Sequence, residues 1–228
     1  MSAAPLAWVG VTLLAYRAAL EIHRRSGSHP AANPMLISVT LVVGVLWLTT
    51  TPYETYFDGA RLIHALVGPA TVALSIPLYS QIARLQTLLI PLTIALLVGS
   101  LTAAASAVAI GWACGASPEV LLALAPKSST MPIALGVADK IGAIPSLTAL
   151  TVTLTGISGA VMADRLLDLT RSDDRALRGF ATGLTAHAIG TAHALREDEV
   201  AGGFAALAMG LNGLATALWL PLLATLIR

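Results

Sequence analysis

A polar segment bracketed by two prolines carries the residues most able to do chemistry in this chain. The segment is Ala125–Leu135 (APKSSTMPIAL), and its Lys127 is the only charged residue between Glu119 and Asp139. Three hydroxyl side chains follow the lysine directly: Ser128, Ser129 and Thr130. A lysine beside hydroxyls and the free amides of a helix start can bind an anion, and this set suits a carboxylate.

Two prolines make a continuous helix through this segment unfavourable. Pro126 and Pro132 each remove an amide donor and restrict the residue before them. In lipid, the freed backbone groups need partners within the protein or a water-filled cavity. We therefore predict a helix break near the membrane midplane that forms half of a substrate site around Lys127. The alternative is a lysine that reaches from a surface loop to the lipid headgroups.

A second polar segment, Gly179–Glu199, contains two histidines. His187 and His193 lie six residues apart in the sequence. Histidines that share a metal on one helical face are spaced by three or four residues, and no cysteine or suitable carboxylate is nearby, so we predict no metal site. At a second break, His187 could bind a substrate carboxylate or carry a proton near neutral pH. The alternative, a histidine bonded to a neighbouring carbonyl, has equal weight for His187 and more weight for His193.

The two segments together define the predicted substrate site. Its residues are Lys127, Ser128, Ser129, Thr130, His187, Gly190 and Thr191. Asp139 and Glu199 follow their segments at the same interval and are candidates for coupling to protons or cations, although such acids more often sit at the solvated base of a hairpin. We predict neither a cofactor nor an enzyme, because no nucleophile–base set, paired carboxylates or phosphate-binding loop is visible.

The composition identifies the class of protein that must position these residues. Hydrophobic residues make up 56% of the 228-residue chain and charged residues only 11%, whereas soluble domains carry roughly a quarter charged residues. We predict an all-α integral membrane protein with about six transmembrane helices and two broken or re-entrant helical hairpins. The net charge of +1 gives no reason to expect a nucleic-acid partner. The single cysteine, Cys114, excludes an internal disulfide.

Apolar segments predict the spans, of which the first is short, and the uncharged runs Leu85–Pro118, Ile141–Ala163 and Val200–Ile227 exceed the ~20 residues that a spanning helix needs. The predicted spans are Pro5–Leu20, Met35–Thr51, Arg61–Tyr79, Leu88–Trp112, Ile144–Ala163 and Phe204–Thr225. Gly68 and Pro69 interrupt the third span, and we predict a helix break there.

The distribution of basic residues indicates whether Pro118–Lys140 crosses the membrane or re-enters. If it re-enters, the loops that contain Arg17–Arg25, Arg84 and Arg165–Arg178 all lie on one side, as the positive-inside rule prefers. If it crosses, the last of these loops moves to the opposite side. We therefore predict a re-entrant hairpin.

A weak internal similarity predicts a second hairpin. A shift of sixty residues places Lys127 on His187, Asp139 on Glu199 and Gly142 on Gly202. Because one crossing separates the two copies, the hairpins would enter from opposite faces. This is the arrangement of the inverted repeats of secondary transporters.

Several motifs resemble the LrgB/CidB family of bacterial membrane proteins, described as antiholin-like or as regulators of murein hydrolase export, which also includes the C-terminal half of the plastid glycolate/glycerate translocator. The matching segments are Gly68–Tyr79 (GPATVALSIPLY), Pro126–Ala134 (PKSSTMPIA), Ile141–Ala149 (IGAIPSLTA), Leu154–Val161 (LTGISGAV), His187–Leu195 (HAIGTAHAL) and Phe204–Ala217 (FAALAMGLNGLATA). The family usually has HGIGTARA, so Ala188 and His193 replace a glycine and an arginine. Met131 stands where a threonine is common.

The resemblance implies a single LrgB-like membrane domain over residues 1–228. It comprises an N-terminal two-helix segment, residues 1–55, and a core, residues 56–228, that contains both polar breaks. The implied location is the bacterial cytoplasmic (inner) membrane, with several crossings. The implied partners are a small LrgA/CidA-type membrane protein and a small carboxylate, and we also expect a homo-oligomer in the lipid bilayer.

Together, the residues and the resemblance favour a secondary transporter of small carboxylates such as glycolate, glycerate or pyruvate. The alternative is a holin/antiholin-like protein that modulates murein hydrolase export and cell lysis and needs no small-molecule site. A third possibility is a subunit that does not transport unless its LrgA-type partner is present.

Overall fold

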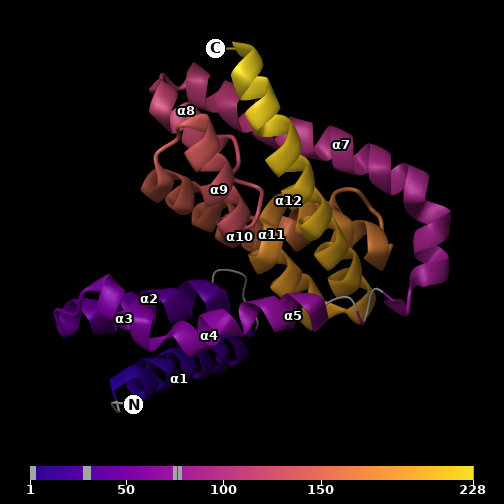
Figure 1. Ribbon diagram of the computed structural model, residues 1–228. Coiled ribbons are helices and arrows are strands. Elements are labelled where there is room, and N and C mark those ends of the chain that lie inside the picture. The colour runs from indigo at the N-terminus through magenta and orange to yellow at the C-terminus, as the bar shows by residue number, and fades with distance from the viewer. Residues whose placement is uncertain (1–3, 28–31, 74–75, 77–78, 228) are drawn as a thin grey trace. The chain divides into compact units, whose positions relative to one another are not determined.

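The computed structural model describes residues 4–27, 32–73, 76 and 79–227, and every regular element in these ranges is a helix (Figure 1). The chain divides into two compact units, Met1–Ala73 and Leu74–Arg228. The division that we predict after residue 55 falls inside helix α3, Tyr53–Gly59.

The first unit contains two longer helices and three short ones. They are α1 (Ala4–Arg25), α2 (Pro34–Leu48), α3, α4 (Arg61–Ala65) and α5 (Val67–Ala73). Helix α3 is held to α1 by Tyr56, whose ring lies 5.8 Å from that of Trp8 in an edge-on arrangement and whose hydroxyl lies 3.1 Å from that of Thr12. An aromatic side chain thus fixes the chain reversal that follows α2.

The third predicted span, Arg61–Tyr79, is not one continuous helix. Its described part forms α4 and α5, which are separated at Leu66. Gly68 and Pro69 are the second and third residues of α5, so the span is interrupted at Leu66, two residues before the predicted position. Proline is tolerated in the first turn of a helix because the amide it lacks would have no helical acceptor there. Residues 74, 75, 77 and 78 lie outside the described residues.

The second unit contains the longest helices. Its elements are α7 (Ile82–Ala113), α8 (Pro118–Leu124), α9 (Met131–Ile141), α10 (Pro145–Asp168), α11 (Arg175–Glu197) and α12 (Glu199–Ile227). Among the described residues, α7, α10 and most of α12 are long and apolar enough to cross a membrane. These helices contain the fourth and sixth predicted spans and all of the fifth except Ile144, which is the N-cap of α10. The chain is therefore a helical membrane protein, as the composition predicts.

Helices α11 and α12 lie side by side and form the centre of this unit (Figure 1). A Cβ atom on Gly179 would collide with the backbone carbonyl of Ala201, and one on Gly183 with that of Ala205. Small residues let two membrane helices approach closely enough for such backbone contact. Residue numbers rise in the same direction along both helices, from Gly179 beside Ala201 to Gly183 beside Ala205. The first half of α11 therefore runs parallel to α12.

We predict that Gly183→Ala destabilises the second unit by about 1–3 kcal/mol, because the added methyl group must push α12 away. The matched control is Gly210→Ala in α12, where an added Cβ meets no atom within 4 Å. Thermal unfolding in detergent micelles would measure both variants. Equal unfolding temperatures for the two variants would show that the close contact of α11 and α12 is not required.

Candidate functional site

The first polar segment interrupts the helix where the prolines predict a break. Helix α8 ends at Leu124 and α9 begins at Met131, with a turn over residues 125–130 between them. Within the turn, the Ser129 amide donates to the Pro126 carbonyl at 3.0 Å, and the Ser129 hydroxyl donates to the same oxygen at 2.9 Å. The Ser129 hydroxyl therefore stabilises the turn itself.

Lys127 projects from this turn and is half-buried. Its Nζ donates to Ser128 Oγ at 3.2 Å, and no described ion pair joins it to a carboxylate. Thr130 occupies the N-cap position of α9, but its side chain accepts no capping hydrogen bond. The first amides of α9 are therefore left without a side-chain partner, and the positive end of the helix lies beside the lysine.

The second polar segment contains a reversal of the chain. His187 lies inside α11 with φ 42° and ψ −133°, which no helix contains. A Cβ atom on Gly190 would lie 2.8 Å from the carbonyl oxygen of Thr182. In a straight helix, two residues as far apart in the sequence as Thr182 and Gly190 would lie about 12 Å apart. The chain therefore folds back at His187, and we call residues 188–197 the returning arm.

His187 is fixed against α10. Its Nε2 lies 3.0 Å from the carbonyl oxygen of Val152, and its side chain is buried. Because a carbonyl only accepts, Nε2 carries a hydrogen, and Nδ1 is left without a partner among the described residues. Gly156 makes room for the ring, since a Cβ there would lie 2.6 Å from His187 Cε1. The Thr191 hydroxyl donates to the His187 carbonyl at 2.9 Å and so stabilises the reversal.

Asn212 of α12 joins the two breaks. Its buried side-chain amide donates to the carbonyl of Ser128 at 2.9 Å and to that of Leu184 at 3.1 Å. The Leu184 carbonyl needs this donor because the amide of Ala188, its partner in a continuous helix, lies beyond the reversal. Asn212 is distant in the sequence from both polar breaks, and the structure places it between the two predicted half-sites.

Three buried polar atoms around this junction have no partner among the described residues. They are Thr148 Oγ1, His187 Nδ1 and Asn212 Oδ1. Asn212 bonds both to the turn that contains Lys127 and to the helical turn before His187, so the two breaks lie next to each other. We call this region, with the Lys127 ammonium and the start of α9, the polar centre. Its donors and its positive charge are suited to a small polar anion.

Sequence reasoning missed Thr148, although a signal was present. Thr148, Val152 and Gly156 are spaced by four residues, which places them on one face of α10. The last two contact His187, and Thr148 lies one turn away on the same face.

Other predicted residues lie elsewhere. Asp139 near the end of α9 and Glu199 at the start of α12 are both exposed, and the structure does not bring them to the polar centre. His193, for which a carbonyl partner is favoured in the sequence, contacts the carboxylate of Asp164 instead. Among the described residues, no group of three or more histidine, cysteine, aspartate or glutamate side chains could hold a metal ion.

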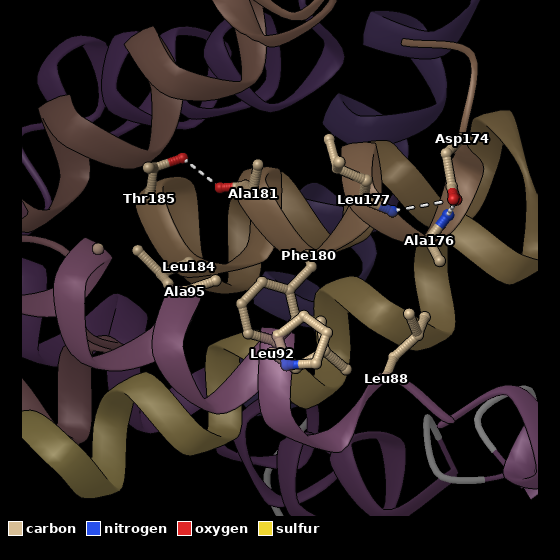
Figure 2. Close-up of a pocket in the computed structure, with 12 residues that line it drawn as sticks. Leu88, Leu92, Ala95, Asp174, Ala176, Leu177, Phe180, Ala181, Leu184 and Thr185 are labelled. Atoms are coloured by element: carbon tan, nitrogen blue, oxygen red, sulfur yellow. Dashed lines mark hydrogen bonds between the residues drawn. The ribbon is translucent and has the colours of Figure 1, made fainter. Parts of the chain in front are cut away.

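Two apolar grooves lie outside the polar centre. One, of about 370 Å³, runs between α7 and α11 and is lined by side chains such as Leu92 and Phe180, with Asp174 at one end (Figure 2). The other, of about 630 Å³, is lined by α7, α8, α9 and α12. Pro118 and Ile141, the outer ends of α8 and α9, both line this second groove, so the two short helices begin and end in the same region.

Comparisons with known proteins agree on one family. The model of the LrgB-like family matches residues 12–226. The uncharacterized protein YxaC of Bacillus subtilis is 32% identical over 93% of this chain and 92% of its own length. The antiholin-like protein LrgB of Bacillus cereus (strain B4264) is 26% identical over 96% of this chain and 95% of its own length. No solved structure matches.

We predict that Asn212→Leu lowers the free energy of unfolding by about 2–4 kcal/mol, because two buried carbonyls lose their donors. Hydrogen exchange should accelerate at both breaks, over residues 125–130 and 184–190. The control is Thr216→Val, one turn further along α12, which removes a buried hydroxyl with no described hydrogen bond. Faster exchange at only one break would contradict the bridging role of Asn212.

Proposed function

Because the chain belongs to the LrgB-like family, we propose that it is an antiholin-like membrane protein, the role that the name of several relatives indicates. The observation that carries this proposal is the match to those relatives along almost the whole of both chains. The names of these relatives support this reading better than they support carboxylate transport. The protein would act in the bacterial inner membrane with a small LrgA/CidA-type partner or as a homo-oligomer, and would restrain membrane lesions that lead to lysis.

The polar centre favours a second candidate, a secondary transporter of small carboxylates such as glycolate, glycerate or pyruvate. The specific observation is Lys127, a half-buried cation with no described acidic partner, beside an uncapped helix start. Ionisable groups within a membrane are costly and are typically retained for a function. The Lys127 ammonium, the Ser128 hydroxyl and the first amides of α9 would hold the carboxylate. His187, when Nδ1 is also protonated, would bind or protonate it from the second break. We propose no enzymatic activity for either candidate.

An inverted repeat of two re-entrant hairpins would give either candidate its architecture. In this proposal α8 and α9 enter from one face and the two halves of α11 from the other, with α10 crossing between them. The shared groove at Pro118 and Ile141 supports the first hairpin, and the contact of Gly190 with Thr182 supports the second. Spanning helices beyond α7, α10 and α12 belong to the same proposal.

Cysteine accessibility tests this topology. We predict that Cys114, which is exposed, and an introduced Asp173→Cys in a Cys114→Ser background react with an impermeant maleimide from opposite faces. The reason is that α10 alone crosses the membrane between these two positions, since α8 and α9 return to the face from which they enter. Labelling of both positions from the same face would rule out re-entry of the first hairpin.

Variants of Lys127 and Lys140 distinguish the two candidate functions. If the protein transports carboxylates, Lys127→Ala should lower saturable uptake of labelled glycolate or pyruvate into proteoliposomes by at least about tenfold, which equals 1.4 kcal/mol of lost binding. Lys140→Ala, which removes an exposed lysine at the end of α9, is the matched control and should leave uptake unchanged.

The antiholin-like role predicts that function does not depend on Lys127. Co-expressed with a holin-like partner, the protein should reduce the leakage of large solutes from cells. Lys127→Ala should restrain leakage as well as the unaltered chain does, because no small-molecule site is involved. Saturable uptake that requires Lys127 would overturn the antiholin-like proposal. Reduced leakage without any carboxylate uptake would overturn the transport proposal.

A further inference from the structure

Two histidines attach the returning arm to α10. His187 lies directly before the arm, and His193 lies in its outer half. At the inner end, His187 Nε2 lies 3.0 Å from the carbonyl oxygen of Val152. At the outer end, His193 Nε2 lies 2.9 Å from Asp164 Oδ2. The inner contact is buried, whereas the outer contact joins two side chains that can both carry charge.

The outer contact is within reach of solvent. The His193 side chain is 16% exposed and that of Asp164 is 57% exposed, so protons can enter and leave the pair. Imidazole is the one side chain whose charge ordinarily changes between about pH 5 and pH 8. The contact is therefore a charge-assisted hydrogen bond when His193 is protonated and a neutral one when it is not.

Few other charges surround this pair. Arg178, at the start of α11, lies 3.6 Å from Asp164 Oδ1 but 2.8 Å from Asp168 Oδ1. Asp168 therefore balances most of the charge of Arg178, and Asp164 Oδ2 is left to His193. These three groups come from α10 and from the first half of α11. No described ion pair brings a charged group of α12 to His193.

Apolar side chains make other contacts of the arm. Ile189 lies against Gly156 of α10, and Leu195 lies against Gly202 of α12. The Thr191 hydroxyl donates to the His187 carbonyl at 2.9 Å and lies 3.7 Å from Met209 Sδ of α12. Among the described hydrogen bonds, the His193–Asp164 contact is the only side-chain bond from the outer half of the arm to α10.

We propose that His193 and Asp164 form a proton-operated latch that holds the outer end of the returning arm against α10. The latch is closed when His193 is protonated and loosens when the imidazole becomes neutral. It goes beyond both functions proposed above and depends on neither. The chain thus carries a pH-sensitive element at the solvated end of its second hairpin.

Hydrogen exchange of the full-length protein in lipid nanodiscs tests the latch at pH 5.5 and pH 8.0. After correction for the intrinsic pH dependence of exchange, amides 192–197 should exchange about two- to fivefold faster at pH 8.0, the range expected for a partly exposed ion pair. Amides 150–160 of α10 serve as the internal reference and should not change. A corrected rate for 192–197 that is the same at both pH values would overturn the proposal.

Three variants distinguish the latch from a general effect of pH. His193→Arg keeps a positive charge and should remain protected at both pH values, whereas His193→Gln should exchange rapidly at both. Asp164→Asn should behave like His193→Gln. A pH difference that persists undiminished in His193→Arg, or that extends equally to 150–160, would assign the effect to another group and overturn the latch.

Discussion

The need to satisfy broken backbone in apolar surroundings governs the second unit. Each helix break frees carbonyl groups that cost several kcal/mol if they are buried without a donor, by order of magnitude. Asn212 supplies one hydrogen to Ser128 in the first break and one to Leu184 in the second. The Thr151 hydroxyl similarly donates to the carbonyl of Ala123 near the end of α8. Side chains from the unbroken helices α10 and α12 thus replace the missing helical donors, and this ties the breaks to each other.

Small residues make these bonds geometrically possible. Gly156 lets the ring of His187 reach the carbonyl of Val152, and Gly190 lets the returning arm lie against Thr182. Gly183 brings α11 close enough to α12 for Asn212 to reach across. The glycines act through the volume that they leave free, because all of them lie in helical backbone. The close contacts of helices and the polar bonds between them therefore depend on one another.

The sequence predicts the helical membrane class, the long helices and the first break, because hydropathy and proline act locally. It places the second break correctly only through a weak internal similarity, since no proline marks it. His187 adopts a positive φ that costs a non-glycine residue about 1–3 kcal/mol. Only the tertiary bonds to Val152 and Thr191 reveal what holds it there. The role of Asn212 depends on two carbonyls that are distant in the sequence, and no local pattern reveals it.

Several predicted site residues already use their hydrogen-bond donors within the protein, so fewer groups remain to contact a ligand. The hydroxyl hydrogens of Ser129 and Thr191 are already donated to carbonyls within their own breaks, and Gly190 provides space for the reversal. The groups without a strong internal partner are the ammonium of Lys127, the first amides of α9 and the orphaned atoms of the polar centre. Recognition at this centre would therefore rest on positive charge and backbone amides more than on hydroxyl groups. In the transport proposal, the positive charge would select for an anion, and the orphaned atoms of Thr148 and Asn212 would distinguish among anions.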